Sequence, residues 1–170
     1  AFIKSMRGSD ANAALFWFER LIQSGADPML LARRIVIQSA EDVGLADPMA
    51  LPIAVSAMTA LQNIGLPEAR LPLSQAILYI CNAPKSNSVE HALMLASEDA
   101  IANPEKQVPA HLADKSFPRD TESPDATPYK YPHNYGGWVE QQYLPDGLTD
   151  RQYYFPSGNG QDTGCRQKKK

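Results

Sequence analysis

The chain has 170 residues, carries a formal net charge of −3 at neutral pH and is 44 % apolar. This length accommodates one domain with a sizeable core, and the composition is typical of a globular protein. There is no run of about 18 apolar residues and no apolar stretch near the start, so we predict neither a membrane span nor a signal peptide. Residues 1–8 resemble the end of a helix stopped by Gly8, and we interpret the chain as a fragment of a longer protein.

The distribution of charge argues against a nucleic-acid-binding protein. Residues 1–103 contain seven basic and ten acidic residues, and residues 104–170 contain nine of each. Strong binding to phosphates relies on clustered positive charge, and the sequence clusters it only in Lys168-Lys169-Lys170. We therefore expect this chain alone to bind nucleic acid weakly.

Apolar residues recur at helical spacing through the first 103 residues, which predicts an all-α domain over residues 1–103. Its helices are separated by capping signals: the suitable N-caps are Asp10, Asp27 and Asp47, and the suitable stops are Gly25, Gly44 and Gly65. Proline fits the first helical position, and it follows two of these N-caps. The five expected helices cover about 10–24, 28–43, 47–65, 67–82 and 87–103.

The first of these helices carries more apolar surface than contact with a core requires. Leu15, Phe16, Trp17 and Phe18 make it apolar on nearly all sides. One face should meet the core. Phe16 and Trp17 are therefore candidates for a second contact, at an interface between subunits, where aromatic side chains are enriched.

Beyond residue 103 the sequence changes character. Residues 104–128 lack apolar periodicity and predict a long irregular connection, whereas six of the seven tyrosines lie between residues 129 and 154. We expect residues 104–156 to form this connection and then an aromatic-rich strap that packs on the helical body, with Trp138 and Tyr143 as anchors. A short helix is predicted over residues 138–144, and residues 157–170 are expected to be disordered.

No sequence pattern indicates catalysis, nucleotide binding or metal binding. The glycine-rich loops that bind phosphates are absent, and the three histidines, His91, His111 and His133, lie in separate segments. The acidic pairs Glu41-Asp42 and Glu98-Asp99 are adjacent and diverge by about 100° on a helix, which favours solvated or ion-paired side chains over acid–base chemistry. Cys81 and Cys165 predict two free thiols in a reducing compartment. We predict no catalytic residue, cofactor or metal site in this chain.

Four basic residues are candidates for contacts with partners. Arg33 and Arg34 are adjacent on the second expected helix, where they could bind phosphate, lie in an interface or pair with carboxylates such as Glu41 or Asp42. Lys85 lies between two expected helices, either as an ordinary loop residue or as a contact to a partner or DNA. Lys130, within the strap, is a second candidate for such a contact.

Several strings resemble one family through their order and spacing. They are AFIKSMRGSD at 1–10, ARRI at 32–35, SAEDVGLADP at 39–48, APKSN at 83–87, YKYPH at 129–133 and VEQQYLP at 139–145. Together they resemble the C-terminal region of replication-associated recombination protein A, the MgsA/RarA family of AAA+ ATPases, which includes the Werner-helicase-interacting protein. The resemblance covers residues 1 to about 156. Residues 116–125 depart from the family pattern, which often has a lysine- and leucine-containing stretch there.

The resemblance implies an all-helical domain similar to the collar of clamp loaders, which assembles the ATPase into a homotetramer. It implies that the full-length protein is a DNA-dependent ATPase acting at stalled or gapped replication forks and associated with single-stranded-DNA-binding protein. ATP and magnesium would be bound by a motor upstream of this chain, and the location would be cytoplasmic and nucleoid-associated. No catalytic residue of the family maps onto this chain, so we do not expect it to hydrolyse ATP.

The residues leave two functions open. The first is homo-oligomerisation through Phe16, Trp17 and the strap. The alternative is a helical module that docks another protein, or single-stranded DNA whose bases stack on the tyrosines and Trp138. The strap has only Lys130 close by to hold a phosphate backbone, which weighs against DNA. A hydrolase built on the acidic pairs ranks last, because no nucleophile or metal ligand is predicted beside them.

Overall fold

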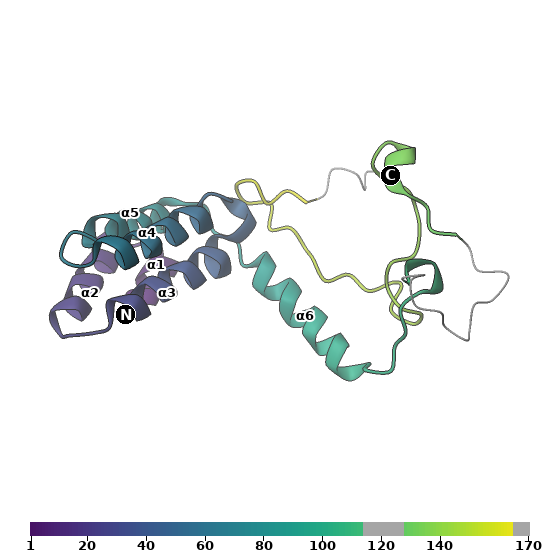
Figure 1. Ribbon diagram of the computed structural model, residues 1–170, viewed down its shortest axis with the longest axis horizontal. Coiled ribbons are helices and arrows are strands. Elements are labelled where there is room, and N and C mark those ends of the chain that lie inside the picture. The colour runs from purple at the N-terminus through teal and green to yellow at the C-terminus, as the bar shows by residue number, and fades with distance from the viewer. Residues whose placement is uncertain (114–127, 165–170) are drawn as a thin grey trace. The chain divides into compact units, whose positions relative to one another are not determined.

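The computed structural model describes residues 1–113 and 128–164 (Figure 1). The chain divides into two compact units. Unit 1 combines Ala1–Leu95 with Tyr154–Gly164, and unit 2 contains Ala96–Tyr153. Within the described residues the chain therefore leaves unit 1 after Leu95 and returns to it at Tyr154.

The fold is all-helical, as predicted, and no strand occurs among the described residues. The part of the chain that the structure describes has six α-helices: α1 (Phe2–Arg7), α2 (Ala11–Gln23), α3 (Pro28–Gln38), α4 (Ala50–Ile64), α5 (Arg70–Asn82) and α6 (Ser88–Ala102). A π-helical turn, η1 (Ser39–Val43), and a 3-10 turn, η2 (Gly44–Ala46), follow α3, and two further 3-10 turns are η3 (Ala110–Leu112) and η4 (Pro132–Tyr135). The prediction of five helices is short by one, because α1 is a helix in its own right.

Aspartate capping fixes the starts of α2 and α3, as the sequence predicted. The Asp10 carboxylate accepts a hydrogen bond from the Ala13 amide at 2.9 Å, and Asp27 accepts one from Met29 at 2.9 Å. These bonds satisfy amide groups that have no partner within the helix. Asp47 likewise accepts from the Met49 amide at 3.0 Å, although α4 itself begins only at Ala50.

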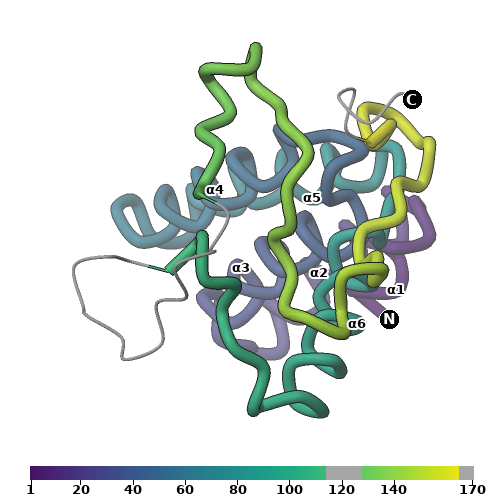
Figure 2. The backbone as a smooth tube through the Cα atoms, turned by 90° about the vertical axis from the view of Figure 1, so that its right-hand side faces the viewer, coloured from purple at the N-terminus to yellow at the C-terminus, as the bar shows by residue number. Residues whose placement is uncertain are grey.

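Helix α5 lies at the centre of unit 1. It packs against α1, α2, α3 and α4, and Figures 1 and 2 show α4 and α5 side by side. Its buried face consists of Leu73, Ala76, Ile77, Ile80 and Cys81. Full burial of each large aliphatic side chain stabilises the fold by about 1.5–3 kcal/mol. Burial also raises the pKa of the Cys81 thiol.

Among the helices around α5, α4 turns mainly small side chains inward, and α1 and α2 each bury an aromatic ring. α4 buries Ala50, Ala54, Ala57 and Leu61, so three of its four buried positions are alanine. Alanine lets neighbouring helix axes approach closely, since little side chain separates them. At the other side of the core, the rings of Phe2 in α1 and Phe18 in α2 lie 6.0 Å apart.

The structure corrects three predicted boundaries. The second expected helix does not continue as an α-helix to Val43, because η1 widens the chain after Gln38. The α4 helix starts at Ala50 instead of Pro48, and α5 starts at Arg70 instead of Pro67. In both cases the proline lies in a turn before the first full helical turn, where its missing amide costs nothing.

The predicted aromatic strap is not supported as an element of this fold. The helix predicted over residues 138–144 is absent, and the local helical turn is instead η4. Tyr129, Tyr131, Tyr135, Trp138 and Tyr143 are all about half exposed. Residues 114–127, most of the predicted irregular connection, lie outside the described residues.

Residues 157–164 were expected to be disordered but adopt a hydrogen-bonded turn that belongs to unit 1. Gly158 donates its amide to the Asp162 carbonyl, and Gln161 donates to the carbonyl of Ala46, both at 2.9 Å. The polar residues whose composition indicated disorder form hydrogen bonds in this turn instead. Residues 165–170 lie outside the described residues.

We expect Ile77→Ala to lower the free energy of unfolding by about 2–5 kcal/mol, because it empties a fully buried site on the central helix. Leu71→Ala on the same helix is the matched control. Its side chain is 77 % exposed, so its cost should be about 0.5 kcal/mol or less. Urea unfolding followed by circular dichroism measures both, and equal losses would contradict a core centred on α5.

Candidate functional site

Helix α6 exposes nearly all of its apolar side chains. Among its 15 residues only Ser88 is buried. Leu93 is 67 % exposed and Ile101 80 % exposed. Val89 and Leu93 lie four residues apart and thus on one side of the helix. A helix of this length is marginal in water without packing, so an apolar side left uncovered makes α6 a candidate contact surface.

A second apolar patch lies on α2. Ala14 and Phe18 point into the core, as the sequence predicted for one face of this helix. Phe16 is 62 % exposed and Trp17 is partly exposed, and their rings meet edge to face with centroids 5.2 Å apart. Two aromatic rings in edge-to-face contact and exposed at the surface are the kind of anchor that protein interfaces use.

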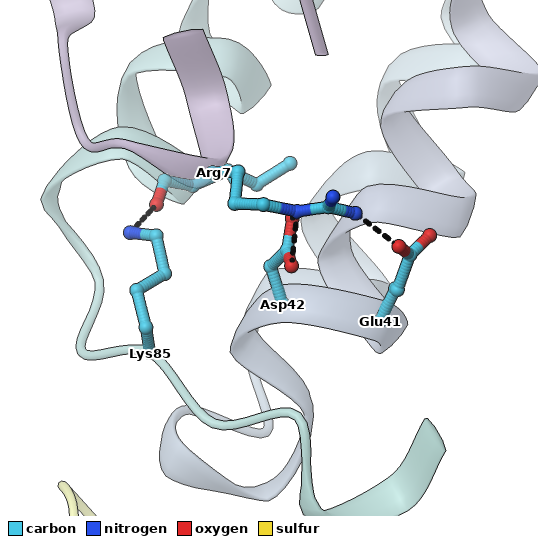
Figure 3. A network of polar contacts seen from close by, with 5 residues as sticks. Arg7, Glu41, Asp42 and Lys85 are labelled. Atoms are coloured by element: carbon cyan, nitrogen blue, oxygen red, sulfur yellow. Dashed lines mark hydrogen bonds and ion pairs between the residues drawn. The ribbon is translucent and has the colours of Figure 1, made fainter. Parts of the chain in front are cut away.

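Arg33 and Arg34 are both exposed on α3. Neither is paired with Glu41 or Asp42, the partners that the sequence offered. Those two carboxylates are instead held by Arg7 at the end of α1 (Figure 3). The two exposed arginines stay candidates for an interface.

The Arg7 cluster joins α1 to the π-helical turn η1. Arg7 Nε donates to Asp42 Oδ1 at 2.9 Å and to Oδ2 at 3.1 Å, while Nη2 pairs with Glu41. Adjacent residues diverge on a helix, yet the guanidinium fork reaches both because its donors point along different edges. Burial raises the pKa of Asp42, and the Arg7 hydrogen bond opposes that effect. The hydrogen bond from Arg7 to Asp42 raises the pKa of Arg7. The cluster is therefore a structural clamp.

Lys85 has a structural role that the sequence did not reveal. Its Nζ donates to the carbonyl of Ile80 at 2.6 Å, of Ala83 at 2.8 Å and of Cys81 at 3.3 Å. These carbonyls lie at the C-terminal end of α5, where helical carbonyls lack partners and cations are favoured. Burial lowers the pKa of Lys85. With its donors occupied in this way, Lys85 is a poor candidate for a phosphate contact.

Trp138, Tyr143 and Lys130 lie in unit 2, where glutamine side chains organise the chain. Gln141 Oε1 accepts a hydrogen bond from the Lys130 backbone amide at 3.1 Å, and Gln141 Nε2 donates one to the Lys130 carbonyl at 2.9 Å. It also donates to the Tyr143 hydroxyl at 2.7 Å. The two most distinctive strings of the sequence, around 130 and 141, are thus held together. The rings of Trp138 and Tyr143 remain about half exposed.

Within unit 1 the predicted site residues lie on three separate elements: α2, α3 and the loop between α5 and α6. An open hollow of about 420 Å³ in unit 1 is lined by Arg7, Glu41, Asp42, Lys85, Ser86, Asn87, Glu90, Ser157 and Asn159. Its two cations are held by carboxylates and carbonyls as described. Within the described residues, no group of three His, Cys, Asp or Glu side chains is placed to hold a metal ion. The hollow presents paired charges instead of an aligned nucleophile and base.

Sequence reasoning also missed Ser86 and Asp162, which form a buried polar contact. Ser86 Oγ donates to Asp162 Oδ2 at 2.7 Å across 76 residues of sequence. Both side chains are almost fully buried. The only available signal was the polar turn composition of 157–164, which we had interpreted as disorder.

Comparison with known proteins assigns the family. A family model described as "MgsA AAA+ ATPase C terminal" matches residues 8–170. The chain belongs to this family. It is 48 % identical over 161 residues to replication-associated recombination protein A of Bacillus subtilis, and 37 % identical over 162 residues to the protein of the same name from Escherichia coli K12. It is also 35 % identical over 156 residues to ATPase WRNIP1 of Dictyostelium discoideum.

These matches cover nearly all of this MgsA C-terminal chain but a minor part of its relatives. They span 94 % of the chain and 38 % of the Bacillus protein, 94 % and 36 % for Escherichia coli, and 91 % and 18 % for Dictyostelium. The resemblance found in the sequence is confirmed at the level of the family. In the described part of this family member, no helix has both the length and the apolar character needed to cross a membrane.

We expect Lys85→Met to lower the free energy of unfolding by about 1–3 kcal/mol, because it leaves the last carbonyls of α5 without a donor. Lys4→Met is the matched control, since Lys4 is exposed on α1, and it should change stability by about 0.5 kcal/mol or less. Thermal and urea unfolding measure the difference. If Lys85→Met is as stable as wild type, the hydrogen bonds of Lys85 do not stabilise the fold, and Lys85 is again a candidate for a contact with a partner.

Proposed function

We propose that this chain is the C-terminal homo-oligomerisation domain of a DNA-dependent AAA+ ATPase that acts in replication and recombination at stalled forks, and that it assembles as a homotetramer. Support for the cellular role comes from the family and from relatives named replication-associated recombination protein A. Support for assembly comes from the surfaces of the domain itself.

The observation that carries the proposal is the uncovered apolar side of α6. Leu93 and Ile101 are mostly in water, although a solitary helix gains its stability chiefly from packing. Each large aliphatic side chain that becomes fully buried contributes about 1.5–3 kcal/mol. A second copy of the same chain supplies a matching apolar helix, because an isologous contact brings the same patch of two subunits together.

Two distinct patches favour a tetramer over a dimer. A tetramer of dihedral symmetry uses more than one kind of self-contact, whereas a dimer needs one. The Phe16–Trp17 pair on α2, in unit 1, is the second apolar patch. Arg33 and Arg34, exposed on α3, supply the arginine that interfaces favour around such anchors.

The other activities are proposed for the whole protein and not for this chain. ATP and magnesium would be bound by the ATPase motor, while DNA and single-stranded-DNA-binding protein would be partners of the full-length molecule in the cytoplasm, at the nucleoid. We propose that this chain contributes no catalytic group. Its part is to hold several motors in one assembly.

We expect the chain to elute as a species of four 18.7-kDa copies in size-exclusion chromatography with light scattering. Replacing Leu93 and Ile101 together by glutamine should shift the mass toward smaller species, because both apolar anchors of α6 are lost. Glu68→Gln is the control, since Glu68 is exposed and lies outside α6. A monomeric mass for wild type at tens of micromolar would refute the proposal.

A second function, docking of single-stranded DNA, is favoured by one observation. Tyr131, Trp138 and Tyr143 are about half exposed on a segment without regular structure, where their faces are open to bases. The charge of this region argues against DNA docking. Lys130 is the candidate phosphate contact in this segment, and its Nζ already lies 3.5 Å from the Glu140 carbonyl.

A fluorescence titration with a labelled oligonucleotide separates the two functions. We expect the oligomerisation domain to bind weakly, with a dissociation constant above about 100 µM at 150 mM salt, since phosphate neutralisation supplies most non-specific affinity. Micromolar binding that falls steeply with salt and is lost in Trp138→Ala would favour docking. Leu71→Ala, on α5, controls for loss of an exposed apolar side chain, because Leu71 belongs to neither candidate surface.

A further inference from the structure

The segment Tyr154–Gly164 is an integral part of unit 1, although residues 96–153 separate it from the rest of that unit. Backbone and side-chain bonds attach it at two places. Gln161 donates its amide to the Ala46 carbonyl in η2, and Asn159 Nδ2 donates to the Lys85 carbonyl, both at 2.9 Å. The segment thus crosses from the end of η2 to the loop between α5 and α6.

Asp162 is the centre of this attachment. Its side chain is 1 % exposed, and its Oδ2 accepts from Ser86 Oγ at 2.7 Å, from the Ser157 amide at 3.0 Å and from Ser157 Oγ at 2.9 Å. Its Oδ1 accepts from the Tyr154 hydroxyl. A buried carboxylate is unfavourable unless its oxygens are hydrogen-bonded, and here donors from three residues satisfy both oxygens.

The charge of Asp162 is maintained by these donors. Burial acts to raise its pKa, but hydrogen bonds from Ser86, Tyr154 and Ser157 outweigh burial and hold the pKa well below its ordinary value of 3.8. A depressed carboxyl pKa contributes stability above pH 3.8 that is lost only as pH falls through the lower, folded value. The contact is therefore constant across physiological pH and does not act as a pH switch.

The backbone of the segment lies unusually close to the body of unit 1. A Cβ on Gly160 would come within 2.2 Å of the Ala46 carbonyl oxygen and 2.7 Å of Pro84 Cγ. Gly160 also has a φ of +52°, which side-chain-bearing residues rarely adopt. This close approach is a second observation, independent of the Asp162 carboxylate, that the segment occupies a defined position against the rest of unit 1.

The same network reaches the first turn of α6. Ser86 Oγ, which donates to Asp162, accepts a hydrogen bond from the Ser88 amide at 3.2 Å. The Ser86 amide in turn donates to the Asp42 carbonyl at 2.8 Å. A negative charge near the N-terminus of a helix is favourable, and Asp162 places one there through a single serine.

We propose that Asp162 is a latch: its hydrogen bonds attach Tyr154–Gly164 to the loop between α5 and α6, and through Ser86 they hold the first turn of α6 in place. The latch does not depend on the oligomeric state.

Hydrogen exchange followed by mass spectrometry on the full chain tests the latch. In Asp162→Asn we expect the amides of 157–162 and of the first turn of α6 to exchange at least about tenfold faster, while α5 keeps its protection. Asp150→Asn is the matched control, since Asp150 is exposed in unit 2. Gly160→Ala leaves Asp162 intact but collides with Ala46, and it should accelerate exchange in 157–162 as well.

A nick-and-hold experiment supplies a second readout. Limited trypsin digestion is used to cut the full chain after the exposed Arg151, so that the C-terminal fragment begins at Gln152, and the product is passed over a native sizing column. The C-terminal fragment should remain with the body in wild type and Asp150→Asn, and separate from it in Asp162→Asn and Gly160→Ala.

Exchange within twofold of wild type in both Asp162→Asn and Gly160→Ala would overturn the proposal, as would release of the wild-type fragment after cutting. If Asp162→Asn does not fold, Gly160→Ala alone tests the latch, because it disturbs the contact with Ala46 and leaves the Asp162 side chain unchanged. A monomeric wild-type chain with an intact latch would refute the proposed assembly alone, and a tetramer without these effects would refute the latch alone.

Discussion

The close packing of α4 on α5 is the constraint on which the rest of the molecule depends. The alanines of α4 bring its axis near α5, and the aliphatic face of α5 then reaches α1, α2 and α3 as well. Once α5 is fixed, its C-terminal end is fixed too, and Lys85 occupies the carbonyls there. The loop that follows receives both the start of α6 and the returning segment Tyr154–Gly164. Surface features of unit 1 thus trace back to one helix pair.

Local rules predicted much of this fold, and non-local contacts account for what they missed. The caps at Asp10 and Asp27 are properties of a few consecutive residues, and they were predicted correctly. The partner of Asp42 was not, because Arg7 is 35 residues away and no periodicity relates them. The role of Asp162 was missed for the same reason. Its hydrogen-bond partner Ser86 is 76 residues away, and a polar stretch without a known partner predicts disorder.

The candidate surfaces were predictable to different degrees. Excess apolar character at Phe16 and Trp17 could be recognised because a helix needs only one buried face, and both side chains are exposed. The exposed side of α6 was not recognised, since its good helical periodicity predicted a packed face and the missing partner leaves no trace in sequence. The family match identifies the chain as the C-terminal domain of an AAA+ ATPase family, and it names none of these surfaces.

The burial of Cys81 has a practical consequence for studying this domain. A thiol reacts as its thiolate and only where a reagent can reach it, and the core around α5 opposes both. The rate at which an alkylating reagent modifies Cys81 therefore reports how often α5 separates from its neighbours, once peptide mapping distinguishes it from Cys165. Alkylation of Cys81 thus measures how often the helical core opens, with no added label and no substitution.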